Sequence, residues 1–212
     1  MKNKIFLDEH RASILKVFGA VLLTFFFVSV QSSFAQSVVR YRLPLSSLST
    51  INAWYDHDSS SAERRYDGYT AWDYPKNIHS GTDFPKSSGT SIYAGAHGEL
   101  YYRIDNCPNA GSINSTCGGG FGNQVRIKHL DNKVTVYAHM KLGTPVGLQS
   151  ILCGAKVGGV GSSGSATGNH LHFELWSSTS IGTRIDPFSG TYSQPTSYWV
   201  NQNSGFPSTS CQ

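Results

Sequence analysis

This chain has few charged residues and no strong cluster of basic ones. Only 14% of its 212 residues are charged, and apart from Arg64-Arg65 the basic residues are scattered. Nucleic-acid-binding surfaces concentrate basic residues on one face, often with aromatic residues among them, so we expect no nucleic-acid partner. The glycine-rich stretch 154–168 is not followed by a Gly-Lys-Ser/Thr sequence, which excludes a phosphate-binding loop of that type.

Long apolar runs are missing after residue 35, and the one near the N-terminus covers only residues 17–30. It falls short of the roughly 20 residues that cross a bilayer as a permanent helix. Basic residues precede it and Ser33-Phe34-Ala35 follows it, a pattern typical of a secretory signal peptide. We therefore expect residues 1–35 to be removed before Gln36 and the protein to be secreted or periplasmic, with no membrane contact afterwards. An uncleaved anchor is the alternative, whereas the lack of a cysteine just after the run disfavours a lipid anchor.

The four cysteines all lie in the part expected to be exported, where an oxidising compartment permits disulfides. Four cysteines allow three pairings. We favour Cys107–Cys117, which flank a short insertion rich in Gly, Asn and Ser, and Cys153–Cys211, which would tie the C-terminal tail to the body. A zinc site made by these cysteines is the rival interpretation, and it is disfavoured because no CxxC spacing is present.

Strand patterns dominate the chain after residue 79, whereas residues 36–75 show no long helical period. The predicted fold is therefore all-β, mainly an antiparallel sheet, with an irregular N-terminal arm over residues 36–75 and long loops. We expect one compact domain over residues 76–190, a C-terminal tail over 191–212 and a monomeric protein. The strands are predicted at residues 91–94, 99–104, 123–129, 133–139, 156–161 and from 170 onward.

The segments 123–129 and 133–139 predict a hairpin, because Asp131-Asn132 supplies a turn between them. Strict alternation along the second strand places Val134, Val136 and Ala138 on one face. It places Thr135, Tyr137 and His139 on the other.

The run His170-Leu171-His172-Phe173-Glu174 is the most informative motif. In a strand, alternate side chains share a face, so both histidines and Glu174 point one way and the apolar residues point into a core. The two imidazoles then stand about 7 Å apart along the strand. This separation is awkward for two ligands of one ion, but it suits one ligand beside a second imidazole that does proton chemistry.

Two further histidine motifs accompany this strand, His79-Ser80-Gly81-Thr82-Asp83 and Tyr137-Ala138-His139-Met140. A hydrolytic zinc site keeps three protein ligands and one position for water. His79 and Asp83 at a tight turn, completed by His172, would supply two nitrogens and one oxygen. His139 and His170 are then left to accept the water proton and to stabilise the oxyanion, while Glu174 would orient an imidazole rather than bind the ion.

Together these motifs, in this order and with Gly122-Asn123-Gln124-Val125, resemble peptidase family M23, the lysostaphin-type and β-lytic-type zinc endopeptidases of bacterial cell walls. The resemblance covers roughly residues 79–176. It implies zinc ligands at His79, Asp83 and His172, catalytic histidines at His139 and His170, and a groove-bearing antiparallel sheet.

The resemblance also implies one Zn2+ per chain and cleavage of peptide bonds in peptidoglycan crosslinks or stems. Gly–Gly bridges, D-Ala–Gly junctions and D-Ala–diaminopimelate crosslinks stay open as the bond that is cut. Some relatives use an upstream tyrosine in the transition state, for which Tyr69 and Tyr74 are the candidates here. Asn169 stands where relatives often have Pro, which changes loop rigidity but removes no ligand.

Two alternatives to an enzyme stay open at this point. One is a non-catalytic cell-wall-binding or regulatory module of the same fold, although such modules typically lack zinc ligands or catalytic histidines. The other is a structural zinc, which is disfavoured because structural sites usually close with four ligands rich in Cys.

Overall fold

The structure is a computed structural model that describes residues 38–48, 50–58, 62–72, 79–180, 183–203 and 206–212. The predicted signal peptide, residues 1–35, lies outside these residues. Within them no helix is long and apolar enough to cross a membrane. Their only helical element is the short 3-10 turn η1 (Cys117–Gly120), which lies in the predicted insertion.

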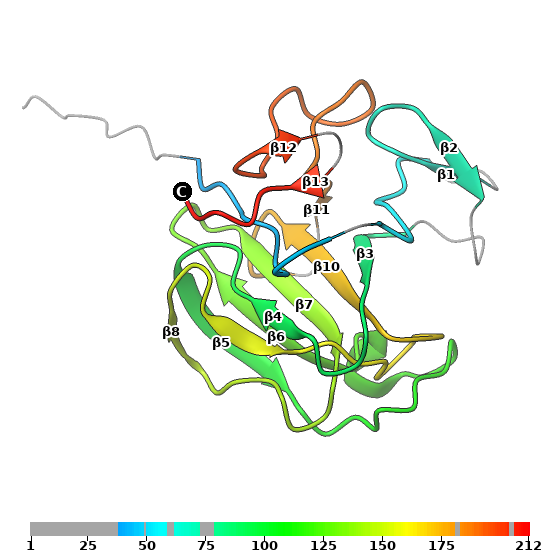
Figure 1. Cartoon of the computed structure of the whole chain (residues 1–212), viewed down its shortest axis with the longest axis vertical. Helices are drawn as coiled ribbons and strands as arrows, with labels where there is room; N and C mark the ends of the chain where they lie inside the picture. Colours follow the sequence, from blue (N-terminus) through cyan, green and yellow to red (C-terminus); the bar gives the residue numbers. More distant parts are fainter. Residues whose placement is uncertain (1–37, 49, 59–61, 73–78, 181–182, 204–205) are drawn as a thin grey trace, which may run out of the picture. The chain divides into compact units, whose positions relative to one another are not determined.

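A seven-stranded antiparallel sheet forms the body of the molecule (Figure 1). Its strand order is β11-β10-β7-β6-β5-β8, and β3 pairs with β10 on the same edge as β11. The strands are β3 (Thr82–Pro85), β5 (Gly98–Ile104), β6 (Asn123–Lys128), β7 (Val134–Met140), β8 (Gln149–Ile151), β10 (His170–Trp176) and β11 (Arg184–Ile185). The predicted all-β, mainly antiparallel fold is confirmed, and the β6–β7 hairpin is where the sequence placed it.

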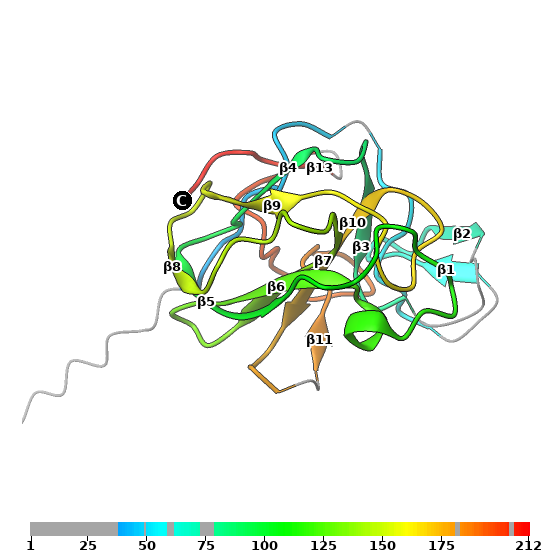
Figure 2. The same cartoon turned by 90° about the horizontal axis from the view of Figure 1, so that it is seen from below.

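Three smaller strand pairs complete the described part of the fold: β1 (Ala62–Arg64) with β2 (Thr70–Trp72), β4 (Ser91–Tyr93) with β9 (Lys156–Gly159), and β12 (Gln202–Asn203) with β13 (Phe206–Pro207). Figure 2 shows the β4–β9 pair over one face of the main sheet. Ile92 of β4 and Val157 of β9 are fully buried in one apolar cluster with Leu100, Ile127 and Phe173 of the main sheet. That cluster is the hydrophobic core.

The predicted alternation along β10 is confirmed. Leu171, Phe173 and Leu175 are fully buried in the core between the layers. His172 and Glu174, and with them Trp176, belong to the opposite face, where Trp176 lies in a separate small apolar cluster. Burial of three large side chains against the β4–β9 layer therefore fixes the direction in which the histidines of this strand point.

The predicted alternation along β7 is wrong at His139. Tyr137 and Met140 lie three residues apart, yet both are buried in the core. A register shift in the β6–β7 pairing marks a β-bulge here, and His139 has a left-handed backbone with φ of 55°. A bulge adds one residue to a strand and re-aims its side chains. As a result His139 leaves the core face, while Ala138 stays with Val134 and Val136, and His139 turns toward the histidines of β10.

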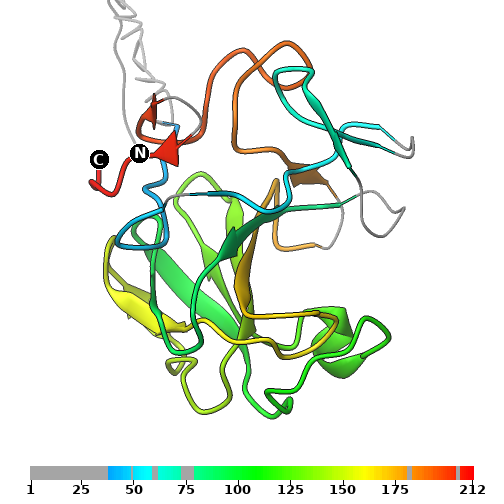
Figure 3. The ribbon, with the colours of Figure 1, turned by 45° about the vertical axis from the view of Figure 1, so that its right-hand side comes forward.

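Both predicted disulfides, Cys107–Cys117 and Cys153–Cys211, are present. The N-terminal and C-terminal segments run beside each other, as Figure 3 shows. Backbone hydrogen bonds join Tyr41 N–H to Tyr198 O and Leu43 N–H to Ser208 O, and both N-terminal side chains are buried in the core. Residues 36–212 form one compact unit, within which the division into arm, domain and tail stays a prediction.

Candidate metal centre

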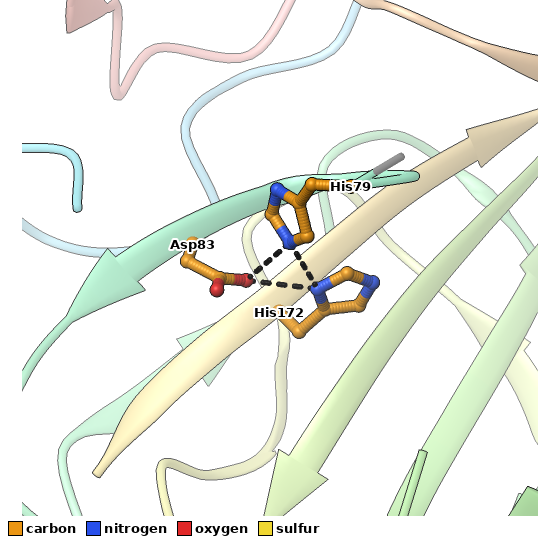
Figure 4. A group of neighbouring side chains, drawn as sticks. All are labelled: His79, Asp83 and His172. Atoms are coloured by element: carbon orange, nitrogen blue, oxygen red, sulfur yellow. Dashed lines mark hydrogen bonds and ion pairs between the residues drawn. The ribbon is translucent and has the colours of Figure 1, made fainter. Parts of the chain in front are cut away.

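His79, Asp83 and His172 converge on one point at the edge of the main sheet (Figure 4). Asp83 on β3 is the direct cross-strand partner of His172 on β10, and His79 lies in the loop before β3. The distance from His172 Nδ1 to Asp83 Oδ1 is 2.8 Å. His79 Nε2 lies 3.2 Å from His172 Nδ1 and 3.3 Å from Asp83 Oδ1.

This donor set fits zinc. A tetrahedral ion with bonds of about 2.0–2.1 Å holds its ligand atoms about 3.3 Å from one another. The three ligand atoms here lie 2.8–3.3 Å apart, so small movements would suffice to place an ion between them. Two imidazoles and one carboxylate leave a fourth position, as in catalytic zinc sites.

Gly81 explains how His79 and Asp83 reach the same point as His172. A Cβ atom at Gly81 would come within 2.8 Å of His172 Cε1 and 2.5 Å of the Phe173 carbonyl oxygen. Any larger residue would therefore force the turn away from β10. The glycine in the His79-Ser80-Gly81-Thr82-Asp83 motif is required by this close approach.

The outward nitrogen of each histidine ligand candidate has its own partner. His79 Nδ1 donates to the Trp54 carbonyl oxygen at 2.8 Å, and His172 Nε2 donates to Glu174 Oε1 at 3.1 Å. Partners of this kind fix ring orientation and increase the basicity of the ligating nitrogen. Glu174 thus has the orienting position that its place on the strand predicts.

Glu174 is buried and is held from several sides. Ser80 donates to Oε1 at 2.5 Å, Trp176 donates to Oε2, and Arg184 Nε lies 3.0 Å from Oε2. Burial raises the pKa of Glu174, but the bonds from His172, Ser80 and Trp176 outweigh it and bring the pKa to about 2. The carboxylate is therefore ionised at neutral pH.

Charge complementarity also acts inside the cluster. Burial lowers the pKa of His172, yet hydrogen bonds to Asp83 and Glu174 raise it to about 10. Burial raises the pKa of Asp83, and the neighbouring His79 and His172 lower it well below its usual range. Asp83 and Glu174 thus place two negative charges around His172, which is an environment that attracts a cation.

His139 and His170 lie beside this cluster but outside the group of three. Their ring centroids are 4.8 Å apart, and the His139 ring is 5.6 Å from the His172 ring. His170 Nε2 lies 3.5 Å from the second Asp83 oxygen, Oδ2. The five residues predicted from the sequence are therefore brought together at one site.

The tautomers of these two histidines follow from their backbone partners. His139 Nδ1 donates to the Ser163 carbonyl at 2.7 Å, and His170 Nδ1 donates to the Gly168 carbonyl at 2.9 Å. In the neutral form of each ring, Nε2 is then the nitrogen with the lone pair. Burial, together with the nearby His172 and His170, lowers the pKa of His139 to about 3, so its imidazole is neutral at neutral pH.

The model of peptidase family M23 matches residues 77–187, more than half of the chain and all five of these residues. The chain belongs to peptidase family M23. This family is zinc-dependent, and the His-Asp-His group of this M23 chain could hold a metal.

Known proteins similar to this M23 chain come from several bacteria. The DD-carboxypeptidase/endopeptidase Mpg of Neisseria meningitidis is 32% identical over 97 residues, which cover 46% of this chain and 20% of Mpg. The peptidoglycan DD-endopeptidase ShyA of Vibrio cholerae is 28% identical over 139 residues, covering 58% of this chain and 30% of ShyA. The chain thus spans less than a third of the length of these curated relatives.

One solved structure similar to this M23 chain is a mutant catalytic domain of the prophage-encoded M23 protein EnpA from Enterococcus faecalis. It aligns with a TM-score of 0.45 and 27% identity, covering 63% of this chain and 95% of that domain.

Sequence reasoning missed the residues that hold the bulge under His139. Asn123 Nδ2 donates to the Met140 carbonyl at 3.2 Å, and the Asn123 backbone N–H donates to Ser163 Oγ at 2.9 Å. Ser163 Oγ donates to the same Met140 carbonyl at 2.7 Å. The Gly122-Asn123 pair is the only sequence signal for this network, because Gly122 has a left-handed φ of 67° and a Cβ there would collide with Ser163.

Only one of the two candidate tyrosines lies among the described residues. Tyr69 is 61% exposed, and the Arg65 guanidinium lies 5.0 Å from its ring. Tyr74 lies outside the described residues. The identity of a tyrosine that stabilises the transition state stays a prediction.

Proposed function

We propose that this protein is a zinc metallo-endopeptidase of the bacterial envelope that hydrolyses peptide bonds in peptidoglycan crosslinks or stems. The observation that carries the proposal is the joint placement of His79, Asp83 and His172 in one ligand cluster with His139 and His170 beside it. Membership of family M23 and similarity to proteins named as peptidoglycan endopeptidases support it.

The roles follow from what each side chain offers. His79, Asp83 and His172 would hold one Zn2+, which when bound supplies the Lewis acid that activates water toward a carbonyl. The rings of His139 and His170 lie beside the ligand cluster, so one can take the water proton while the other, once protonated, stabilises charge on the reacting oxygen. Trp54 and Glu174 hold the ligand rings in orientation from outside.

A non-catalytic wall-binding module has less support. A binding module has no need for two further imidazoles beside the ligand cluster, one of them, His139, buried and neutral. The backbone partners at Ser163 and Gly168 keep these two imidazoles in the tautomer that a general base requires. We further propose that the protein acts as a monomer in the periplasm or outside the cell, on peptidoglycan peptides.

The test uses the exported protein and purified sacculi. We expect about one zinc per chain by elemental analysis, release of muropeptides from sacculi, and loss of release on chelation that zinc restores. His139→Ala should keep the zinc and lose activity by about 10²–10⁴-fold, because one proton-transfer group contributes this much. Full muropeptide release by a zinc-free preparation would refute the proposal, and loss of zinc from the His139→Ala variant would place His139 among the ligands.

A further inference from the structure

A buried arginine lies on the same face of the main sheet as the metal cluster. Arg126 on β6 is only 8% exposed, and its Nε donates to Gln124 Oε1 at 3.0 Å. No described carboxylate forms an ion pair with the Arg126 guanidinium. A guanidinium removed from water without an acidic partner is costly unless something compensates it.

Aromatic rings supply part of that compensation and form the walls around the guanidinium. Its carbon lies 4.1 Å from the centre of the Tyr102 ring and 4.5 Å from the Trp176 ring. Phe121 lies farther off, at 5.9 Å, and the Tyr101 hydroxyl is also beside it. Stacking on ring faces leaves the guanidinium edge, with its Nη donors, available to an anion.

The register connects this arginine to the metal cluster. Arg126 pairs with Val136 on β7, and Val136 pairs with Glu174 on β10, two residues beyond His172. The Phe121 ring touches both the Arg126 group and the His172 ring, the latter at 5.9 Å between centroids. Arg126 and His172 are thus separated by two strand spacings across the sheet and two residues along a strand, which together give about 12 Å. Three or four residues of an extended peptide span this distance.

A second arginine lies close to this part of the face. The guanidinium carbon of Arg184 lies 5.9 Å from the centre of the Trp176 ring, and Arg184 Nε donates to Glu174. The same carboxylate is also bonded to His172, Ser80 and Trp176. The charge of Glu174 also acts on Arg126, but no carboxylate from the described part of the chain is bonded to its guanidinium.

We propose that Arg126, framed by Tyr102 and Trp176, binds a carboxylate of the substrate peptide within about three or four residues of the bond that is cut. The proposal rests on the proposed peptidase function and narrows its substrate. A guanidinium edge matches a carboxylate with two parallel hydrogen bonds and discriminates against a carboxamide. Crosslinks whose amino acids carry free carboxylates are then preferred over neutral glycine bridges.

The test compares two crosslinked muropeptides that differ only in whether the carboxyl groups near the crosslink are free or amidated. We expect the wild-type protein to cut the free form with a kcat/KM at least about tenfold higher, since hydrogen bonds to a charged group contribute this much. Arg126→Gln should bring the two values together by lowering only the free form. Lys156→Gln, which removes an exposed positive charge from β9, should keep the wild-type preference.

Each outcome decides the matter. Equal cleavage of both peptides by the wild type, or an unchanged preference in Arg126→Gln, overturns the proposal. If Arg126→Gln fails to fold, Arg126→Lys keeps the charge but loses the planar fork, and it should show a reduced preference. If the wild type cuts neither peptide, the peptidase proposal fails, and calorimetric binding of the free against the amidated peptide to the zinc-loaded protein then tests Arg126 separately.

Discussion

The two faces of the main sheet use the same strands for different purposes. The face toward β4–β9 is apolar and closely packed, with Leu171, Phe173 and Leu175 as its members from β10. The opposite face carries the metal cluster and charged residues such as Glu174 and Arg126, with only a small apolar cluster around Trp176. Simple alternation maintains the first face, whereas the second depends on a bulge, a close glycine and hydrogen bonds between distant segments.

This contrast predicts that changes on the core face lower stability, and that changes on the site face lower activity while the protein stays folded. Four substitutions test it, in order of decreasing effect.

His172→Ala should give the largest effect. It removes a ligand candidate and leaves Asp83 without its closest partner, so we expect zinc content to fall below a tenth per chain and muropeptide release to fall by more than about 10³-fold. Elemental analysis and a sacculus digestion assay measure the two quantities. Retained zinc with lost activity would show that His172 is not a ligand.

Phe173→Ala, one residue farther along the same strand, should act on the other face. The side chain is fully buried and packs against Tyr137 and Trp199 with ring centroids 5.4 and 5.3 Å away. We expect the free energy of unfolding to fall by about 3–5 kcal/mol. Denaturant titration measures this, and kcat at a temperature where the variant is folded should change less than about tenfold. A large loss of kcat in the folded variant would contradict the separation of the two faces.

Asn123→Ala tests the bulge that connects the faces. The amide holds both the Met140 carbonyl and the Cys107 backbone, so its loss leaves buried groups without partners and should cost about 1–3 kcal/mol of stability. We also expect kcat to fall about 10- to 100-fold with zinc content unchanged, because His139 loses its position. Asn123→Asp serves as the matched variant, since it keeps the acceptor but not the donor. Normal kcat in the alanine variant would show that the bulge is held by Ser163 alone.

His129 should give the smallest effect, as a change in pH dependence. It lies in the turn between β6 and β7, with Nδ1 donating to the His97 carbonyl and Nε2 accepting from Thr135 Oγ1. Burial lowers the pKa of His129 below its usual value, and the His97 carbonyl and Asp131 only partly offset this. The unfolded chain then binds the proton more readily, so stability present above about pH 6.5 falls as the pH drops below it.

Between pH 7.5 and pH 5.5, we expect the free energy of unfolding to fall by about 1 kcal/mol less in His129→Gln than in the wild type. The reason is that one proton taken up on unfolding changes this free energy by about 1.4 kcal/mol per pH unit. Denaturant titrations of both proteins at the two pH values give the comparison. Identical pH dependence in the two proteins would show that His129 does not contribute to the loss of stability in acid.

Much of the fold was predictable because its signals are local. The alternation of β10, the turn at Asp131-Asn132 and both disulfides were predicted from neighbouring residues and are confirmed. The bulge at His139 was not predictable, because it exists only in relation to the register of β6. The partners at Trp54 and Ser163 were also missed, since a backbone carbonyl that meets a ring from a distant segment leaves no pattern in the side chains.

The sequence by itself determined the chemistry of this protein: which imidazoles and carboxylate are available, which face of β10 they occupy, and the family to which the chain belongs. Alternation and residue type act over a few neighbouring positions, so they can be read without a partner strand. Only the tertiary structure decided that Asp83 lies opposite His172, that His139 turns out of the core, and that Arg126 lies between aromatic rings. These depend on strand register and packing between distant segments, which no short stretch of sequence specifies.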